Sequence, residues 1–368
     1  MLTSKRSALP SDAEGWNLTR FDPATLNPKR GHLESTFVKL NDPTSTKALW
    51  LKLTVFSPTS GACGEDPRKG AHIVGEAWAI AFDRGDGTSA RTRDHLAVKR
   101  SVPIATTTLA RTRPYRIEIA GVHYDGKRVH GEIARSVGER IAFDLTLTPR
   151  EVAPYVPFPH PGLYFSAFPK TKLVSPILDA SADGVVDVTR RGVTERWIVE
   201  GWSAMQGHNW GTAHADTYAW AHCNQWHEPE GEGLVLEGFS AKVKLAGGLR
   251  TPMVTIVSIR DRGVRYEATT LAQIPHARGS IEGLRRWNFR AVHADARIEG
   301  SLSMRDDDIV GLYYPNPNGE MTFCLNSKIA RATLRFEAHR RAPRVLTSDA
   351  AALEIATHDP MHGAKMYV

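Results

Sequence analysis

The side chains best suited to chemistry are concentrated in one short stretch of the chain, between Gly207 and Trp226. The stretch opens with Gly207-His-Asn-Trp-Gly211 and resumes, after six residues, as Tyr218-Ala-Trp-Ala-His-Cys-Asn-Gln-Trp226. Successive side chains of a β-strand point to opposite faces, so one face of such a strand would carry Tyr218, Trp220, His222, Asn224 and Trp226. The other face would carry the smaller residues Ala219, Ala221 and Cys223, together with Gln225.

A row of aromatic, imidazole and amide groups on one face is an unusual choice for plain packing. A buried His or Asn without a partner costs about 1–3 kcal/mol. Inside a ligand-holding barrel the same row supplies apolar walls with a few convergent polar groups, as small-molecule sites do. The sequence therefore predicts that this strand lines a ligand cavity and turns its small face outward, toward a neighbouring element.

The same stretch resembles a known group of proteins. The segment Glu200-Gly-Trp-Ser-Ala-Met-Gln-Gly-His-Asn-Trp-Gly211 is similar to the DHNWG-like motif that follows a Gly-rich strand in carotenoid 1,2-hydratases. Tyr218-Ala-Trp-Ala-His-Cys-Asn224 is similar to the WxWxQCN-like strand of tocopherol cyclases. Over residues 196–240 the chain thus resembles the AttH, carotenoid 1,2-hydratase (hydroxyneurosporene synthase) and tocopherol cyclase group. This resemblance implies a pair of lipocalin-like antiparallel barrels with a hydrophobic ligand in a cavity; fungal lipocalin-like pericyclases are similar in fold.

The resemblance also implies candidate site residues. Carotenoid hydratases use the motif His, the motif Trp and a Tyr-x-Asp pair about twenty-five residues further on. The first two correspond to His208 and Trp210, and the Asp position falls on Glu237. The Tyr position falls on Val235, and Gly207 stands where the hydratases have Asp. These two departures argue against a simple hydratase.

A proton-driven reaction on an alkene would explain these residue types. Burial raises the pKa of a carboxylic acid, so a buried Glu237 could donate a proton in a dry site. The ring faces of Trp210, Trp220 and Tyr218 could stabilise a developing carbocation by ~2 kcal/mol. His208 and Asn209 could orient a water molecule or a substrate oxygen. The structural alternative is that His208 caps a turn, that Trp210 belongs to the core and that Glu237 pairs with an arginine.

The surrounding sequence predicts an all-β protein, because its dominant period is two. Alternating stretches run over residues 48–56, 115–124, 141–148, 196–203, 234–245, 253–259, 296–303 and 330–337. Short helices are expected only at residues 175–181, 281–286 and 349–357. Many short strands with few helices favour antiparallel sandwiches or barrels, and here two tandem lipocalin-like barrels.

The chain is expected to divide into two related β units. Residues 149–169 contain six prolines, which cannot supply ladder donors, so this segment is predicted to be a packed, extended connector. We expect an N-terminal barrel over residues 1–155 and a C-terminal barrel with the GHNWG motif over residues 156–368. A weak internal repeat, with residues 48–56 matching 218–226, supports this expectation; chance similarity between β-strands is the alternative.

Composition excludes several function classes. The net charge of +7 comes from scattered basic residues, without the stripe or the motifs of a nucleic-acid-binding protein. No apolar run is long enough for a membrane-spanning helix, although the mild basic excess allows peripheral membrane contact. Three cysteines far apart and no secretory signal predict a cytoplasmic location. Neither a metal-ligand spacing nor a phosphate-binding glycine loop is present, so no metal and no cofactor are expected.

Two functions remain open from the sequence. The first is binding of an isoprenoid, polyketide or lipid-like molecule with cofactor-independent, proton-assisted hydration or cyclisation. The second is a non-catalytic carrier of a hydrophobic ligand on the same fold. A structural stress protein of the same superfamily, without an enclosed cavity, is a third alternative. The sequence identifies neither the ligand nor the oligomeric state.

Overall fold

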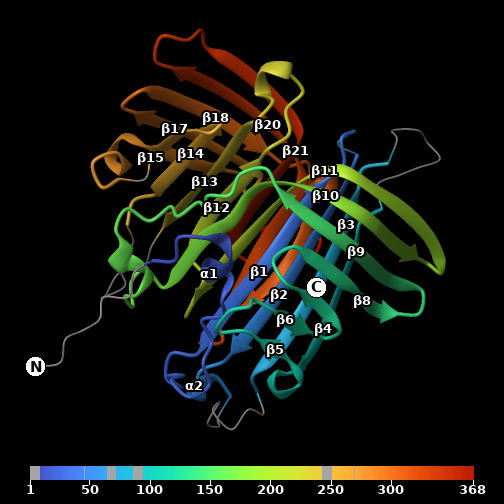
Figure 1. Ribbon diagram of the computed structural model, residues 1–368. Helices are drawn as coiled ribbons and strands as arrows, with labels where there is room; N and C mark the ends of the chain where they lie inside the picture. The colour runs from blue at the N-terminus through green and yellow to red at the C-terminus, as the bar shows by residue number, and fades with distance from the viewer. Residues whose placement is uncertain (1–8, 45, 64–71, 86–93, 243–250, 269) are drawn as a thin grey trace, which may run out of the picture.

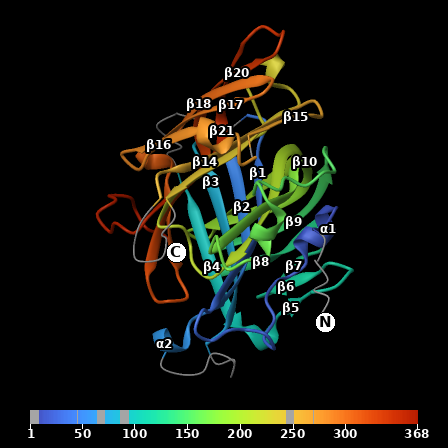
Figure 2. The ribbon, with the colours of Figure 1, turned by 90° about the vertical axis from the view of Figure 1, so that its left-hand side faces the viewer.

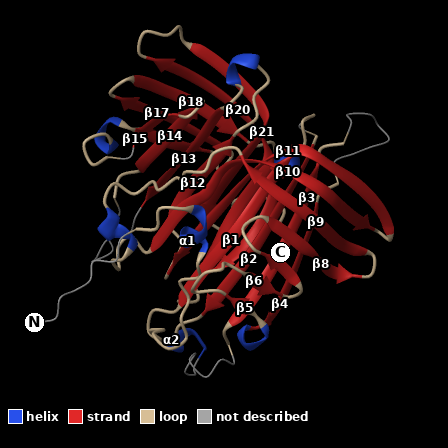
Figure 3. Cartoon of the chain, viewed as in Figure 1, coloured by secondary structure: helices blue, strands red, loops and turns tan. Residues whose placement is uncertain are grey.

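The computed structural model describes residues 9–44, 46–63, 72–85, 94–242, 251–268 and 270–368. Nearly all regular structure is antiparallel β-sheet, as Figure 3 shows. The α-helices are single short turns, α1 (Ala13–Asn17) and α2 (Ser60–Cys63). The 3-10 turns are η2 (Ile104–Thr106), η3 (Pro161–Tyr164), η4 (Pro229–Gly231), η6 (Ile274–His276) and η7 (Asp306–Asp308). None of the described helices is long and apolar enough to cross a membrane.

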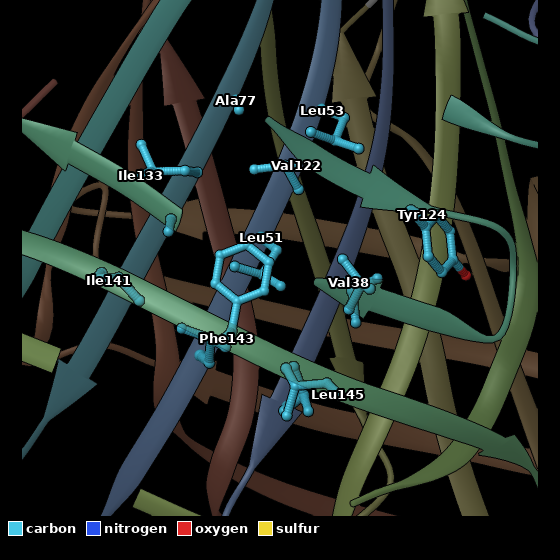
Figure 4. Close-up of a cluster of buried hydrophobic side chains, with 14 of the residues drawn as sticks. Val38, Leu51, Leu53, Ala77, Val122, Tyr124, Ile133, Ile141, Phe143 and Leu145 are labelled. Carbon is cyan, nitrogen blue, oxygen red and sulfur yellow. The ribbon is translucent and has the colours of Figure 1, made fainter. Parts of the chain in front are cut away.

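The first sheet has eleven strands, in the order β4-β3-β2-β1-β11-β10-β9-β8-β7-β6-β5 (Figure 1). In chain order these strands are β1 (His32–Asn41), β2 (Lys47–Ser57), β3 (Val74–Asp83), β4 (Leu96–Pro103), β5 (Thr108–Leu109), β6 (Ile117–Ile119), β7 (Val122–Tyr124), β8 (Arg128–Ser136), β9 (Glu139–Pro149), β10 (Thr171–Arg190) and β11 (Val193–Gly211). The sheet curls so that β4 lies against β8 and β9. Its concave side is filled by aliphatic and aromatic side chains such as Val38, Leu51, Ile133 and Phe143, which Figure 4 shows meeting between the strands.

The second sheet has ten strands, in the order β15-β14-β13-β12-β21-β20-β18-β17-β16, with β19 paired to β20. In chain order they are β12 (Thr217–Cys223), β13 (Leu234–Lys242), β14 (Val254–Asp261), β15 (Val264–Ala268), β16 (Arg278–Glu282), β17 (Arg286–His293), β18 (Ala296–Ser303), β19 (Val310–Pro315), β20 (Met321–Ala338) and β21 (Arg344–Thr357). This sheet is also curled, which brings β15 and β14 toward β17 and β16. The all-β, two-barrel expectation is therefore confirmed.

The two sheets pack against each other through their outer faces. Strand β20 of the second sheet lies against β1, β2 and β3 of the first, and Figure 2 shows the two sheets as stacked bodies. A separate apolar cluster fills this junction and includes Phe37, Trp50, Trp78, Met205 and Trp220. Strands at the junction are thus buried on both faces. In β2, for example, Leu49 and Leu51 fill the first barrel while Trp50 faces the second sheet.

The strand orders of the two sheets repeat each other. In each sheet a long hairpin closes the unit, β10–β11 in the first and β20–β21 in the second. The second strand of that hairpin pairs with the opening strand of its own unit, which is β1 in the first sheet and β12 in the second. Topology therefore matches β12 with β1, one strand away from the match between residues 218–226 and 48–56 that the sequence suggests.

The prediction of three short helices is wrong. Residues 175–181 lie in β10, residues 349–357 lie in β21, and residues 281–286 form the turn from β16 into β17. Pairing on both sides of β10 and β21 provides hydrogen bonds that override a weak local helical pattern. Residues 115–124 form the hairpin β6–β7 around Ala120-Gly121 rather than one strand. The predicted strand at 234–245 ends at Lys242, and its last three residues lie outside the described residues.

The proline-rich segment joins two adjacent strands of the first sheet, β9 and β10. It crosses over the second sheet on the way, since Arg260 of β14 donates hydrogen bonds to the carbonyls of Ala153 and Pro154. Tyr155 and Tyr164 are buried within it, as expected for a packed connector. The division at residues 155 and 156 stays a prediction. The boundary between the two sheets lies elsewhere in the chain. Strands β10 and β11 belong to the first sheet, and residues 212–216 link the two sheets.

Gly207 supports this junction. It pairs with Phe37 across β11 and β1, and a Cβ on Gly207 would lie 2.2 Å from the Phe37 Cζ atom. The Phe37 ring in turn meets the Trp220 ring edge-on, with the centroids 5.6 Å apart. Glycine is therefore required for Phe37 to reach the second sheet, and the aspartate that hydratases carry here would displace the ring.

We predict that Gly207→Ala lowers the free energy of unfolding by about 1–3 kcal/mol, because the new methyl group overpacks the junction. Chemical denaturation measures the change. Gly61→Ala is the matched control, since a Cβ at Gly61 meets nothing within 4 Å. The double variant Gly207→Ala/Phe37→Ala should show a favourable coupling energy; strictly additive losses would contradict the steric explanation.

Candidate functional site

A cavity of about 730 Å³ lies between the two sheets. Its apolar walls come from both sheets and from the proline-rich connector, and include Phe37, Trp50, Phe158, Trp220, Phe239 and Ile256. A smaller set of polar side chains opens into it, including Lys52, Asn209, His214, Tyr218, Tyr314 and Glu354. An apolar chamber with a few polar groups is the usual composition of a small-molecule site.

The cavity lies outside both barrels, and this corrects the expected geometry of β12. Ala219, Ala221 and Cys223 pack into the core of the second barrel rather than outward. Tyr218 and Trp220 point the other way, toward the first sheet, and line the cavity. The alternation predicted from the sequence is therefore right, but its orientation is reversed. The small face of β12 points into the second barrel and the large face points toward the first sheet, because the two barrels pack against each other there.

Glu237 is a buried carboxylic acid behind the cavity wall, next to the lining residue Trp220. It lies on β13, on the same face as the cavity-lining Phe239, and its side chain is 1% exposed. Its Oε1 accepts hydrogen bonds from Ser175 Oγ at 2.8 Å and from Trp220 Nε1 at 3.1 Å. Burial raises the pKa of Glu237 to about 7, against the lowering effect of these two donors and of Arg260 and Lys39.

The other oxygen of Glu237 lacks a partner. Within the described part of the chain, Glu237 Oε2 is buried and makes no hydrogen bond, and the same holds for the Tyr155 and Ser258 hydroxyls. Ser258 is the partner of Glu237 across β13 and β14, and the pKa of Tyr155 is raised by burial and by the Glu237 charge. A protonated Glu237 thus has an oxygen that no protein group occupies.

His222 and Asn224 are tied into a buried polar chain that joins the sheets. Lys39 Nζ of β1 lies 3.3 Å from His222 Nδ1 and donates to Asn224 Oδ1 at 3.2 Å. His222 Nε2 lies 2.9 Å from the Leu178 carbonyl, and Asn224 Nδ2 donates to Asp179 at 2.7 Å. These groups find protein partners instead of lining the cavity. Trp226 lies beyond the end of β12, where its Nε1 donates to the Leu234 carbonyl and its ring packs on the second core.

His208 and Trp210 face away from the cavity, toward the N-terminal segment. His208 is 1% exposed, with Nδ1 2.7 Å from the Trp16 carbonyl and Nε2 2.9 Å from Glu34 Oε1. Trp210 packs in a cluster with Trp16 and Tyr164, and the Arg20 guanidinium lies 5.2 Å from its ring centroid. Asn209, between them on β11, points into the cavity.

The structure therefore separates the predicted site residues into two places. Asn209, Tyr218 and Trp220 line the cavity. Glu237 lies behind this wall, where it accepts a hydrogen bond from the Trp220 indole. His208 and Trp210 lie on the opposite face of β11, while His222, Asn224 and Trp226 have structural partners. The catalytic assignment of His208 and Glu237 stays a proposal.

Several residues that line the cavity are not among those predicted from the sequence. Trp50, Lys52 and Tyr314 come from strands outside the GHNWG region, and Glu354 lies opposite Trp220 on β21. Period two within Ala-Leu-Trp-Leu-Lys-Leu-Thr-Val-Phe56 places Trp50 and Lys52 on one face, which was an available signal. The contributions of Tyr314 and Glu354 have no such signal in the sequence, because they depend on how the sheets pack.

These features define a class: a protein of two lipocalin-like barrels with a ligand-sized chamber between them. The family model described as tocopherol cyclase-like matches residues 177–357, so this part of the chain is similar to that family. No curated protein sequence gives a significant match.

Solved structures support the fold. The crystal structure of CghA matches with a TM-score of 0.55 and 11% identity, over 95% of this chain and 93% of that one. CghA with Sch210972 gives 0.52 and 12%, over 90% and 89%. Kievitone hydratase from Nectria haematococca gives 0.48 and 11%, over 96% and 95%, and a candidate AttH protein from Nitrosomonas europaea gives 0.49 and 12%, over 93% and 98%. The CghA matches show a shared fold.

Glu34 fastens the N-terminal segment over His208. Its carboxylate accepts hydrogen bonds from the backbone N–H groups of Arg20 and Phe21, each at 2.7 Å, and contacts His32 and His208 at 3.0 and 2.9 Å. Burial opposes ionisation, but the hydrogen bonds and charges of the two histidines hold the pKa of Glu34 well below its usual 4.5.

We predict that Glu34→Gln lowers the free energy of unfolding near neutral pH by about 2 kcal/mol, because an amide cannot accept from all of these donors. A carboxyl group with a depressed folded-state pKa stabilises the fold above its unfolded-state value and loses this effect as pH falls through the folded-state value. The difference from the wild type should therefore be full above pH 4.5 and shrink in stronger acid.

Denaturant titration across pH measures this difference. Glu118→Gln is the control, since Glu118 also contacts a histidine and an arginine but is about one-third exposed. A Glu34→Gln variant as stable as the control at neutral pH would contradict the fastening role.

Proposed function

We propose that this protein binds a hydrophobic small molecule, of isoprenoid, polyketide or lipid-like class, in the cavity between its two sheets, and catalyses a cofactor-independent, proton-assisted hydration or cyclisation. The observation that carries the proposal is the combination of an aromatic-lined chamber of about 730 Å³ with a buried carboxyl group of raised pKa directly behind its wall. CghA, which shares the fold, has been crystallised with the small molecule Sch210972.

The chamber suits a reaction through a cation. The rings of Trp50, Tyr218 and Trp220 line it, and an aromatic face stabilises a desolvated positive charge by ~2 kcal/mol. Asn209 also opens into the chamber, and its amide makes no hydrogen bond with the described residues. This amide is suited to orienting a water molecule or a substrate oxygen.

Glu237 is the proposed proton donor. Its pKa of about 7 keeps a large fraction protonated near neutral pH, where an ordinary carboxyl group is ionised. The partnerless Oε2 would carry the proton, while Ser175 and Trp220 hold Oε1 and orient the group. Since Glu237 lies behind Trp220, transfer requires the reacting alkene to approach the end of the chamber at the Trp220 ring.

The proposed reaction needs no cofactor, because Glu237 both supplies and recovers the proton. The O–H bond of Glu237 breaks as the alkene π electrons form a new C–H bond, which leaves a carbocation and the Glu237 carboxylate. A water molecule or an internal nucleophile then adds to the cation. The proton that this nucleophile loses returns to Glu237, which restores the starting acid.

We predict that Glu237→Gln reduces turnover about 100-fold to 10,000-fold, the usual contribution of a general acid. The substrate is unidentified, so the readout is the small molecule that co-purifies with each variant, identified by mass spectrometry. Wild type should carry product, and Glu237→Gln should carry a substrate that lacks one water or is an isomer of the product. An unaltered product in the variant would exclude Glu237 as donor.

Ser175→Ala provides a matched second variant. The Ser175 hydrogen bond lowers the pKa of Glu237, so its removal should raise that pKa and extend activity to higher pH. Wild-type activity should decline as pH rises through about 7, where the acid form is lost. One unchanged compound bound to wild type and to both variants would instead support the non-catalytic carrier.

The proposed location is the cytoplasm. Cys223 and Cys324 are both buried free thiols, which is in keeping with a reducing compartment.

A further inference from the structure

Three lysines lie buried at the junction of the sheets, and one of them differs from the others. Lys39 contacts His222 and Asn224, and Lys328 donates to Glu354 and Asn326, both at 2.7 Å. Lys52, on β2, is 5% exposed and opens into the cavity. Within the described residues its ammonium group forms neither a hydrogen bond nor an ion pair.

Aromatic rings surround Lys52 on the protein side. Its Nζ atom lies 3.7 Å from the Tyr314 ring centroid, 5.4 Å from that of Trp78 and 5.6 Å from that of Trp50. Ring faces stabilise a cation without accepting a conventional hydrogen bond from it. The cage thus holds the ammonium group in place and leaves its donors for whatever occupies the cavity.

The carboxylates near Lys52 already have other partners. Glu76 pairs with Lys99 at 2.7 Å and also accepts from Trp78 and Ser101. Glu354 pairs with Lys328 at 2.7 Å. The nearby Cys324 is a neutral thiol, since burial raises its pKa well above the usual value. Lys52, Lys99 and Lys328 therefore carry three positive charges against the two negative charges of Glu76 and Glu354, and of these three lysines Lys52 is the one that lines the cavity.

Lys52 remains mostly charged near neutral pH. Burial lowers its pKa to about 8, but Glu354 and Glu76 oppose the shift. His214, on the same cavity, is neutral, because burial and the Lys52 charge lower its pKa to about 3. A buried cation without an anionic partner is costly, so a site of this kind is complete only when an anion enters it.

We propose that the ligand carries a singly charged oxygen anion, such as a carboxylate, that pairs with Lys52 Nζ, while its apolar body lies along Trp50, Trp220, Phe239 and Ile256. This inference rests on the proposed binding function, but not on catalysis by Glu237. The ligand class is thereby an amphiphilic acid rather than a pure hydrocarbon.

The test compares two fluorescent probes of the same shape, cis-parinaric acid and its methyl ester. Wild type should bind the acid about tenfold more tightly than the ester, since a charge-assisted hydrogen bond contributes on this scale. Lys52→Met should bind both with the affinity that wild type has for the ester. Lys52→Arg, which keeps the charge, should retain the preference for the acid.

Lys47→Met is the matched control. Lys47 lies on the same strand and also stands over a tryptophan ring, Trp197, but it pairs with Glu195 at 2.7 Å and does not line the cavity. This variant should keep the full preference for the acid.

The outcomes separate the two proposals. If wild type binds neither probe, the hydrophobic binding function itself fails. If wild type binds acid and ester equally, or Lys52→Met keeps the preference, the Lys52 assignment is overturned while the binding function stands. Should Lys52→Met not fold, Lys52→Gln takes its place, and the wild-type comparison decides in any case.

Discussion

The structure depends on burying both faces of the strands where the two barrels meet. Phe37 and Trp50 on β1 and β2 meet Trp220 on β12, while the opposite faces of the same strands fill the barrel cores. Apolar burial contributes roughly 25 cal/mol per Å², so this shared wall is a major source of stability. It also fixes where a ligand chamber can form, because side chains of both sheets and of the connector line that space.

Polar groups at this junction explain why the chamber is chemically specific. Most of them are satisfied in pairs or chains, such as Lys328 with Glu354 and Lys39 with Asn224. Burying an unpaired charge is expensive, so pairing is the normal solution. Glu237 Oε2 and the Lys52 ammonium make no hydrogen bond within the described residues, and both belong to the wall or its immediate backing. One is an acid whose pKa burial raises to about 7, and the other is a cation held by aromatic rings.

Neighbouring residues of the GHNWG segment serve different purposes because β11 separates two environments. Asn209 faces the chamber, whereas His208 and Trp210 contact the N-terminal segment through Glu34 and Trp16. Gly207 is required by Phe37 across the ladder, which gives a steric reason for the absence of the hydratase aspartate. The motif thus helps to build the first barrel and its junction with the second.

The sequence by itself determined the β class, most strand positions and the alternation of β12, because period-two patterning is a local property of the chain. It also indicated Glu237, Asn209, Tyr218 and Trp220, which all lie at or behind the cavity wall. Only the tertiary structure decided which side of each barrel wall faces a ligand. Both faces of β2 and of β12 are buried, so which face points into the barrel depends on long-range pairing and on the contact between the sheets. The same long-range contacts surrounded Lys52 with Tyr314, which lies more than two hundred residues away in the chain.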